Sequence, residues 1–246
     1  MSEVQIIVLA AGQGKRMGGT LPKALVPLGG KPMLSYPLKA IKDSGVCDRP
    51  VIVVGKGSRL VKKTFGSNYS YVIQKPQLGT GHAVRVAKDA LAGAKNIMVL
   101  YGDGPLISPT LIKNLADTHL ESGSVLTMAT VTVTDFDGWR SEFKSFGKIV
   151  RDENGLIKKI VERKDANAQE TLIQELNPAY YCFSTTWLWD NIEKLTLGNA
   201  QGEYYLTDLV QIAVDQGHEI KTVDIRPEEA LGVNTKEQLS EIAKLL

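Results

Sequence analysis

The stretch Ile6-Ile7-Val8-Leu9-Ala10-Ala11-Gly12-Gln13-Gly14-Lys15-Arg16-Met17, followed by Leu21-Pro22-Lys23, lies near the start of the chain. Its continuous apolar run predicts a strand that is buried on both faces. The run ends in small residues and glycines, which allow a ligand to approach the backbone closely. Arg16 and Lys23 place two cations beside that backbone. Because free backbone N–H groups and fixed positive charge together bind phosphate oxygens, we expect a polyphosphate site here.

A glycine-containing turn after a buried strand also opens dinucleotide-binding folds. That pattern has a third glycine, and the corresponding residue here is Met17. It also has an acidic residue at the end of the next strand, and the strand expected over residues 51–54 ends without one. A nicotinamide cofactor is therefore disfavoured.

Size and composition describe an ordinary globular chain. The 246 residues are 43% hydrophobic and 23% charged, which is enough for one sizeable core, and we expect a single domain over residues 1–246. A formal net charge of +2 gives no reason to expect nucleic acid or a membrane as a partner. Without a signal peptide or a long apolar span, a cytoplasmic location is expected, with Cys47 and Cys182 reduced and packed in the core.

Helical and strand patterns alternate along the first half of the chain. Helices are expected over residues 32–44 and 108–122, and strands over residues 51–54, 69–74, 96–101 and 124–133. This alternation predicts an α/β fold with a Rossmann-like, mostly parallel sheet flanked by helices. In such sheets ligands bind beyond the carboxyl ends of the strands, which directs attention to the loop that follows each strand.

The loop after the strand at residues 69–74 begins with Gln74. Its side-chain amide offers a donor and an acceptor together, which suits the edge of a nucleobase. Gly79 and Gly81 flank Thr80 and permit close approach of a base or its sugar. The alternative is a glycine-rich turn before a helix that begins near His82, with Thr80 as its N-cap.

Asp103 follows the strand at residues 96–101 and lies between Gly102 and Gly104. A carboxylate at the end of a parallel strand faces the cleft and suits Mg²⁺ held jointly with phosphates. The alternative role is that of a turn residue. Near the other end of the chain, Asn234 is either a further ligand or the N-cap of the terminal helix.

The regular alternation lapses in the second half. Residues 134–146 have no clear period and predict a mobile surface loop or lid. Residues 148–162 predict a hairpin around the turn at 152–155, and therefore a small antiparallel element over the sheet edge, with Glu162 at its end as either a solvated charge or a cleft residue. A strand interrupted by Pro178 is expected over residues 175–183. The helix that follows is expected to bury an apolar face made of Trp187, Leu188 and Ile192.

Taken together, these loops resemble those of the sugar-nucleotide pyrophosphorylases, and most of all the uridyltransferase half of bifunctional N-acetylglucosamine-1-phosphate uridyltransferase/glucosamine-1-phosphate acetyltransferases. The matching segments run in order along nearly the whole chain. They are Leu9-Ala10-Ala11-Gly12-x-Gly14-x-Arg16-Met17, Leu21-Pro22-Lys23, Gln77-Leu78-Gly79-Thr80-Gly81-His82-Ala83, Leu100-Tyr101-Gly102-Asp103, Ile160-Val161-Glu162-Arg163-Lys164-Asp165, residues 199–205 and Gly232-Val233-Asn234.

The resemblance implies a nucleotide-diphospho-sugar transferase fold and a role for each matching residue. It implies nucleotide binding by Leu9, Ala10, Ala11, Gly12, Gln74, Gly79, Thr80 and Tyr101. It assigns Arg16 and Lys23 to the triphosphate and the transition state, Asp103 and Asn234 to Mg²⁺, and Gly147, Glu162 and Asn177 to the sugar phosphate. The implied substrates are UTP and N-acetylglucosamine 1-phosphate, and the implied products are UDP-N-acetylglucosamine and pyrophosphate.

Two departures from the family pattern limit this expectation. The 246 residues contain no hexapeptide repeats, so acetyl transfer is not expected. Where the family has Asn-Thr-Gly or Asn-Ser-Gly, this chain has Asn177-Pro178-Ala179, and the loop before Gly147 is longer. The same chemistry with another sugar or nucleotide, and a binding module without catalysis, therefore stay open as alternatives.

Overall fold

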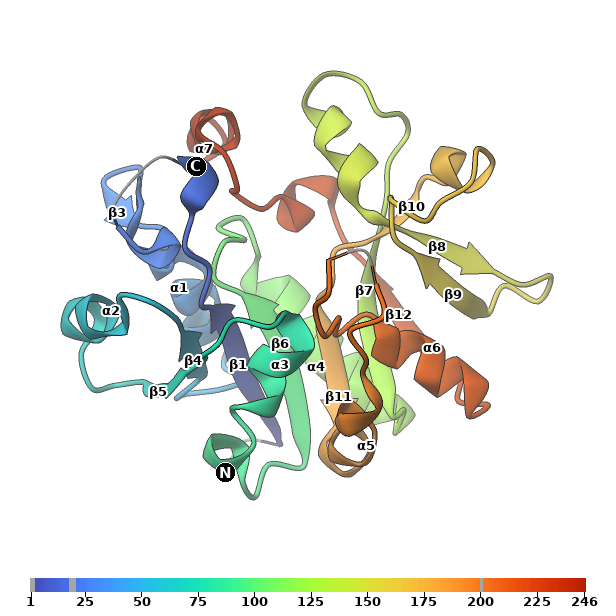
Figure 1. Ribbon diagram of the computed structural model, residues 1–246, viewed down its shortest axis with the longest axis horizontal. Coiled ribbons are helices and arrows are strands. Elements are labelled where there is room, and N and C mark those ends of the chain that lie inside the picture. Colours follow the sequence, from blue (N-terminus) through green and yellow to red (C-terminus); the bar gives the residue numbers. More distant parts are fainter. Residues whose placement is uncertain (1–2, 18–20, 200) are drawn as a thin grey trace.

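The computed structural model describes residues 3–17, 21–199 and 201–246 (Figure 1). Ten strands in these residues form one mixed sheet in the order β5-β4-β1-β6-β11-β7-β10-β8-β9, with β12 paired to β7. The strands are β1 (Val4–Ala10), β4 (Val51–Val54), β5 (Ser70–Ile73), β6 (Asn96–Tyr101), β7 (Leu126–Thr132), β8 (Gly147–Arg151), β9 (Ile157–Val161), β10 (Glu175–Asn177), β11 (Tyr181–Ser184) and β12 (Lys221–Asp224). A separate short hairpin consists of β2 (Pro27–Leu28) and β3 (Lys31–Pro32).

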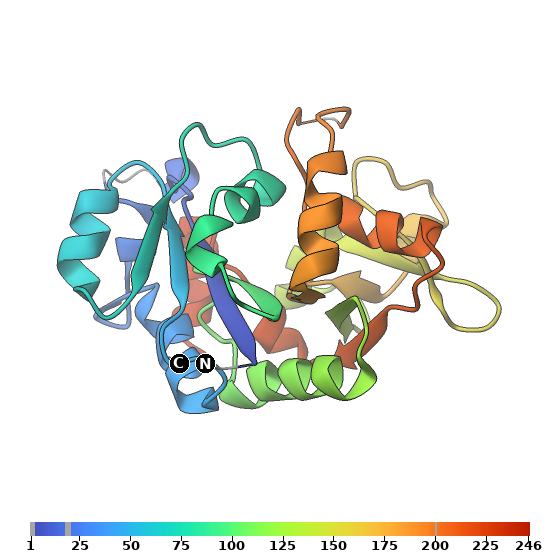
Figure 2. The same ribbon diagram turned by 90° about the horizontal axis from the view of Figure 1, so that it is seen from below.

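Helices cover both faces of the sheet, as Figure 2 shows from below. One apolar core includes residues of α1 (Ser35–Ser44), α2 (Ser58–Phe65), α4 (Pro109–Ser122) and α7 (Lys236–Ala243). The other includes residues of α3 (Thr80–Arg85), α5 (Thr185–Asn191) and α6 (Asp208–Asp215). Ile6 and Val8 of β1 belong to the first core, and Ile7 and Leu9 belong to the second. The prediction that β1 is buried on both faces is therefore confirmed.

The parallel part of the sheet is confirmed around β1. β1 pairs in parallel with β4 and β6, and β4 pairs in parallel with β5. Their carboxyl ends therefore lie along one edge, where the loops with Gln74 and Asp103 begin. β11 then pairs antiparallel with both β6 and β7, so the sheet is mixed from that point on.

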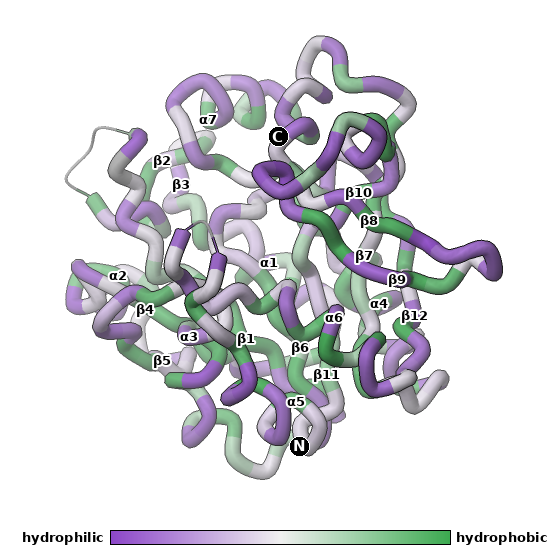
Figure 3. The backbone as a smooth tube through the Cα atoms, turned by 45° about the vertical axis from the view of Figure 1, so that its right-hand side comes forward, coloured by the Kyte–Doolittle hydropathy of each residue, from purple (hydrophilic) through white to green (hydrophobic). Residues whose placement is uncertain are grey.

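The predicted hairpin is present as β8 and β9, which pair antiparallel. It joins the large sheet through β10, which pairs antiparallel with both β7 and β8. At the turn, Asp152 Oδ1 accepts hydrogen bonds from the backbone N of Asn154 and Leu156, both at 2.9 Å. Figure 3 shows this turn as a hydrophilic tip, whereas β8 nearer the sheet is hydrophobic.

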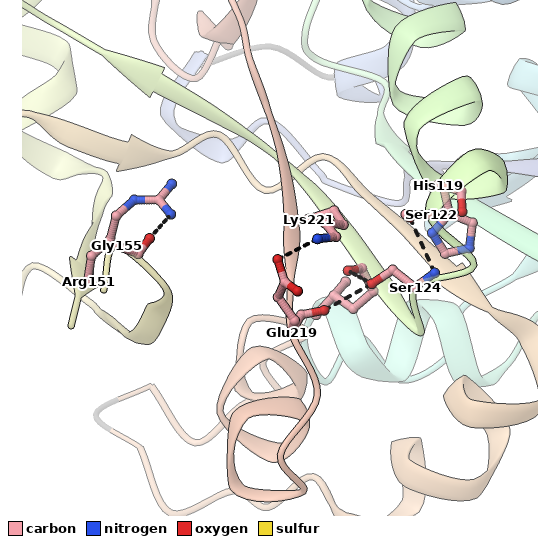
Figure 4. Close-up of polar contacts among 8 residues, drawn as sticks. His119, Ser122, Ser124, Arg151, Gly155, Glu219 and Lys221 are labelled. Atoms are coloured by element: carbon pink, nitrogen blue, oxygen red, sulfur yellow. Dashed lines mark hydrogen bonds and ion pairs between the residues drawn. The ribbon is translucent and has the colours of Figure 1, made fainter. Parts of the chain in front are cut away.

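Helix α4 is fixed at both ends. Ser108 is its N-cap and accepts a hydrogen bond from Leu111 N at 3.1 Å, and Gly123 ends it with a left-handed φ of 61°. Just beyond, Ser124 Oγ donates to Glu219 O at 3.1 Å, which connects the start of β7 to the segment before β12 (Figure 4). Inside α4, His119 is 2% exposed, with Nδ1 2.9 Å from Thr127 Oγ1 and Nε2 3.2 Å from Asn96 Oδ1. The helix therefore has a buried polar attachment to β6 and β7.

Three boundaries differ from the sequence-based expectation. The first predicted helix begins at Ser35, because Pro32 pairs with Pro27 in the small hairpin. The strand expected over residues 175–183 is two strands, and the interruption lies at Pro178, which has no N–H for a ladder. The segment 134–146 contains a 3-10 helix, η4 (Gly138–Ser145), in which Phe143 is fully buried. The apolar face made of Trp187, Leu188 and Ile192 is buried as predicted.

Candidate active site

A cleft of about 740 Å³ lies beyond the carboxyl ends of β1, β5 and β6. It brings together all of the residues predicted for nucleotide binding, which are Leu9, Ala10, Ala11, Gly12, Gln74, Gly79, Thr80 and Tyr101. The predicted catalytic and metal-binding residues also line it, namely Arg16, Lys23, Asp103 and Asn234. It further contains residues to which no role was assigned from the sequence, namely Gln13, Gly14, Ala24, Gln77, Ala83, Gly102 and Glu203.

The glycine-bearing loop forms one wall. Gly14 has φ of 62°, and the backbone N of Met17 donates to its carbonyl at 2.8 Å, which closes the short 3-10 helix η1 (Lys15–Met17). Met17 is 5% exposed and anchors this turn, whereas Arg16 is exposed beside the cleft. The next part of the loop, residues 18–20, lies outside the described residues.

Lys23 is at the centre of a polar cluster. Its Nζ donates to Asp103 Oδ2 and, at 2.7 Å, to Asn234 Oδ1, and its side chain is 13% exposed. Arg16 Nη2 donates to the same Asn234 oxygen at 3.2 Å. Lys23 begins the 3-10 helix η2 (Lys23–Leu25), whose Ala24 and Leu25 are buried, so its backbone is firmly anchored. The cluster therefore combines two cations with two side chains, from distant parts of the chain, whose oxygen atoms could bind a metal ion.

The segments that carry Asp103 and Asn234 are connected by a backbone hydrogen bond. Val233 N donates to Asp103 O at 2.9 Å, which fixes the segment before α7 against the loop after β6. Thr235 is the N-cap of α7 and accepts a hydrogen bond from Gln238 N at 3.2 Å. The alternative that Asn234 caps this helix is therefore wrong, because its neighbour does so and the Asn234 side chain points to Lys23.

The donor set of this cluster fits Mg²⁺. Asp103 and Asn234 supply oxygen atoms, which this ion prefers, and both atoms already lie within hydrogen-bond reach of the single ammonium of Lys23. In the described part of the chain, no group of three or more His, Cys, Asp or Glu residues is placed to hold a metal ion. Mg²⁺ is commonly held by one or two carboxylates together with substrate phosphates and water, so a two-residue site is consistent with this ion.

Gln74 and Thr80 form the opposite wall. Gln74 is 5% exposed, and its Nε2 donates to Gly79 O at 2.9 Å and lies 3.1 Å from His82 Nδ1. The alternative that Thr80 is the N-cap of α3 is wrong. Gly79 holds that position with φ of 101°, where a Cβ atom would lie 2.6 Å from Tyr204 O, so only glycine fits. The hydroxyl of Thr80 instead accepts a hydrogen bond from Leu206 N at 3.0 Å.

Gln13 and Gln77 join the two walls. Gln13 Nε2 donates to Gln77 Oε1 at 2.5 Å, and Gln77 Nε2 donates to Ala11 O. Gln77 lies inside the segment that carries the family resemblance, and Gln13 lies inside the glycine-bearing loop, so their positions alone could have suggested a role. Glu203 lies in the loop at residues 199–205, whose Ala200 is outside the described residues.

The three residues predicted for the sugar phosphate form a second cluster. Asn177 of β10 is paired with Gly147 of β8. A Cβ atom on Gly147 would lie 3.6 Å from Glu162 Oε1 and 3.8 Å from Asn177 Cβ. The backbone of Gly147 and the side chains of Glu162 and Asn177 are therefore close neighbours. Glu162 Oε1 also accepts a hydrogen bond from Thr207 Oγ1 at 3.3 Å. None of the three lines the 740 Å³ cleft itself.

Burial perturbs the titratable groups around these clusters. Burial raises the pKa of Glu162, and the nearby carboxyl of Asp208 adds to this effect. Burial, followed by the neighbouring Asp103, raises the pKa of the Tyr101 hydroxyl well above its usual range. The tyrosine is therefore neutral at physiological pH and serves as a wall of the cleft, not as a proton acceptor.

Residues 6–211 match the family model of the MobA-like NTP transferase domain. The chain therefore belongs to this family of nucleotidyltransferases. Among curated proteins it is similar to the bifunctional protein GlmU of Clostridium botulinum, with 42% identity over 242 residues, and to that of Clostridium beijerinckii, with 43%. Each of these matches covers 98% of this chain and 51% of the relative, so the chain spans about half the length of these relatives.

Solved structures share the fold at lower identity. A UDP-glucose pyrophosphorylase complexed with UDP-glucose superposes with a TM-score of 0.78 at 20% identity, over 100% of this chain and 98% of the other. A putative glucose-1-phosphate thymidylyltransferase from Bacillus anthracis superposes with a TM-score of 0.76 at 20% identity, over 98% and 94%. Of the helices described, none is both long and apolar enough to cross a membrane.

Proposed function

We propose that the chain transfers a uridylyl group from UTP to N-acetylglucosamine 1-phosphate, with Mg²⁺, to give UDP-N-acetylglucosamine and pyrophosphate. The observation that carries this proposal is the cluster of Lys23, Asp103 and Asn234 with Arg16 beside the glycine-bearing loop. It combines the fixed cations and oxygen donors that phosphoryl-type transfer needs at one point of a nucleotide-sized cleft.

The chemistry needs no nucleophile from the protein. A phosphate oxygen of the sugar phosphate attacks the α-phosphorus of UTP, and the bond from that phosphorus to the oxygen bridging to the β-phosphate breaks. Pyrophosphate leaves with that electron pair, and the attacking oxygen is already ionised near neutral pH. The protein therefore has to align two anions and neutralise the charge that accumulates on the leaving group.

The chain's own residues divide this work. Arg16 and Lys23 neutralise the triphosphate, and the backbone of Gly12 and Gly14 allows it to approach the loop. Asp103 and Asn234 would hold Mg²⁺, which would supply further positive charge to the phosphate oxygens. Lys23 contacts an oxygen atom of Asp103 and one of Asn234 in this structure, and its ammonium group would turn to phosphate oxygens once the nucleotide is bound.

The similarity to GlmU proteins supports the proposed sugar, whereas one segment near Asn177 differs from the family pattern. About 40% identity to GlmU proteins over 98% of the chain favours a substrate of that class. Pro178 and Ala179 depart from the family pattern immediately after Asn177, at the proposed sugar end. The choice of sugar therefore has to be measured directly.

The deciding experiment measures pyrophosphate release with Mg²⁺ across a panel of nucleoside triphosphates and sugar 1-phosphates. We expect release chiefly from UTP with N-acetylglucosamine 1-phosphate, and little from glucose 1-phosphate. Release with a different pair would keep the mechanism and reject the named substrates. If product binds tightly and no pair releases pyrophosphate, the chain is a binding module and the proposal is wrong.

A further inference from the structure

The amide of Gln74 has an orientation that the protein itself dictates. Gln74 Nε2 donates to Gly79 O at 2.9 Å, and a carbonyl oxygen can only accept. If the amide were turned over, its own oxygen would lie against the oxygen of Gly79. The NH₂ group of Gln74 is therefore directed to the Gly79 side.

The second hydrogen of this NH₂ group is directed to His82. Gln74 Nε2 lies 3.1 Å from His82 Nδ1, and both side chains are buried, at 5% and 7% exposure. Because the amide nitrogen has no lone pair to offer, Nδ1 must be the acceptor, and the ring proton must sit on Nε2. Burial and then the charge of Arg85 lower the pKa of His82, which keeps the ring neutral at physiological pH.

His82 itself has a fixed position. It lies in α3, where Gly81 N donates to Tyr204 O at 2.8 Å, and its ring is stacked on that of Tyr204 with centroids 6.5 Å apart. With both hydrogens of the Gln74 amide engaged, no side chain or backbone group in the described residues donates to Gln74 Oε1. Gln74 lines the cleft, so the group that it offers to a nucleobase is an acceptor.

We propose that His82 is a positioning residue that holds the carbonyl oxygen of Gln74 toward the nucleobase, so that the site selects a pyrimidine with a ring N–H over cytosine. This inference rests on the proposed function and adds the basis of nucleotide choice. Uracil carries an N–H between its two carbonyl groups, whereas the same ring position in cytosine is a nitrogen that only accepts. Cytosine would therefore bring two acceptors together and leave both unpaired, which strongly disfavours its binding.

Two variants of similar size separate hydrogen bonding from packing. In His82→Asn the side-chain oxygen can occupy the place of Nδ1 and accept from Gln74, whereas His82→Leu has the same branching and no acceptor. We expect His82→Leu to lower the ratio of kcat/KM for UTP to that for CTP by about tenfold or more, mainly through a higher KM for UTP. His82→Asn should keep most of the wild-type ratio.

The inference is overturned if the two variants have the same ratio, whether that ratio is retained or lost. If the wild-type protein releases no pyrophosphate from UTP, the proposed function is wrong, and the inference that rests on it fails too. A long-range ¹H–¹⁵N correlation spectrum of the wild-type protein tests the geometry without any substitution, should His82→Leu fail to fold. We expect an unprotonated Nδ1 and a protonated Nε2 on His82, and a neutral ring protonated on Nδ1 contradicts the inference.

Discussion

Ala179 adopts a backbone conformation that its side chain disfavours. Its φ is 65°, in the left-handed region that glycine occupies without strain. The link between β10 and β11 imposes this conformation, because Ala179 N donates to Asn177 Oδ1 at 2.9 Å and Ala129 N donates to Tyr180 O at 2.9 Å. We expect Ala179→Gly to raise the free energy of unfolding by roughly 0.5–1 kcal/mol, measured by urea denaturation.

The same substitution in a helix is the control. Ala40 is buried inside α1, and Ala40→Gly should lower the free energy of unfolding by about 1 kcal/mol or more. If Ala179→Gly destabilises the protein as much as Ala40→Gly does, the strain at Ala179 is not the dominant effect.

Lys23 stands between the two oxygen atoms proposed for Mg²⁺, so its removal has two opposite effects. Lys23→Met keeps most of the length of the side chain, which ends one atom earlier, and removes the charge. We expect turnover to fall by about a hundredfold or more, because a cation that stabilises the transition state is lost. The affinity of the nucleotide-free protein for Mn²⁺, measured by electron paramagnetic resonance, should rise, because a competing cation has gone.

Lys39→Met provides the matched comparison for this variant. The Lys39 side chain is 74% exposed and pairs with Asp43 on α1, so both turnover and Mn²⁺ affinity should stay near the wild-type values. Near-normal turnover of Lys23→Met would reject the catalytic role of Lys23.

Among the elements, α4 depends on a buried histidine. Burial lowers the pKa of His119 from 6.5 to about 4. The unfolded chain therefore binds more protons than the folded protein between these two values, and the free energy of unfolding decreases as pH falls from 6.5 to 4. This group should contribute roughly 3 kcal/mol to that decrease. Urea titrations of the wild type and His119→Gln at several pH values would measure it.

His119→Gln should show a shallower decrease over this range, because glutamine does not titrate. Ser122→Ala is the control on the same helix. It removes the hydrogen bond from Ser122 Oγ to His119 O, at 3.2 Å, and should lower stability equally at every pH. An unchanged pH dependence in His119→Gln would mean that other groups cause the acid sensitivity.

A buried lysine gives β8 a pH dependence in the alkaline range. Lys148 is 1% exposed, and its Nζ lies 4.4 Å from the ring centroid of Phe136 and 3.4 Å from Phe143 O. Burial, assisted by the charge of Arg163, lowers the pKa of Lys148 from 10.5 to about 8. The unfolded chain binds more protons between these values, so Lys148 makes stability rise with pH from 8 to 10.5. Lys148→Met should remove this rise, and thermal unfolding at pH 8 and 10.5 would detect the difference.

At the scale of the whole molecule, the sequence could predict the parallel half of the sheet and the cleft residues that end its strands, such as Gln74 and Asp103. Buried parallel strands have a distinct apolar pattern, and their loops meet at one edge whatever the details of packing. The sequence could not predict that β10 connects the hairpin to the large sheet, because this pairing depends on contacts between distant segments. It also left the cap of α3 undecided, since only the contact of Gly79 with Tyr204 excludes Thr80 from that position.

The residues proposed for the two substrates lie on different halves of the sheet. Gln74 lies at the end of the parallel half, whereas Gly147, Glu162 and Asn177 lie on the antiparallel half. We expect Gln74→Met to raise the KM for UTP by about tenfold, with little effect on the KM for the sugar phosphate. Glu162→Gln should raise the KM for the sugar phosphate and have little effect on the KM for UTP, because it keeps the size of the side chain and removes its charge.

The double variant tests whether the two halves act independently. Residues that share no partners have additive effects on free energies, so the double variant should combine the KM increase for UTP of Gln74→Met with the KM increase for the sugar phosphate of Glu162→Gln. Steady-state kinetics with each substrate varied in turn would measure all four proteins. If each single variant raised both KM values equally, or if the double variant kept one of the two KM values near wild type, the substrates would not be divided between the halves. In that case both substrates would contact the same residues, and the change from parallel to antiparallel pairing at β11 would not separate their sites.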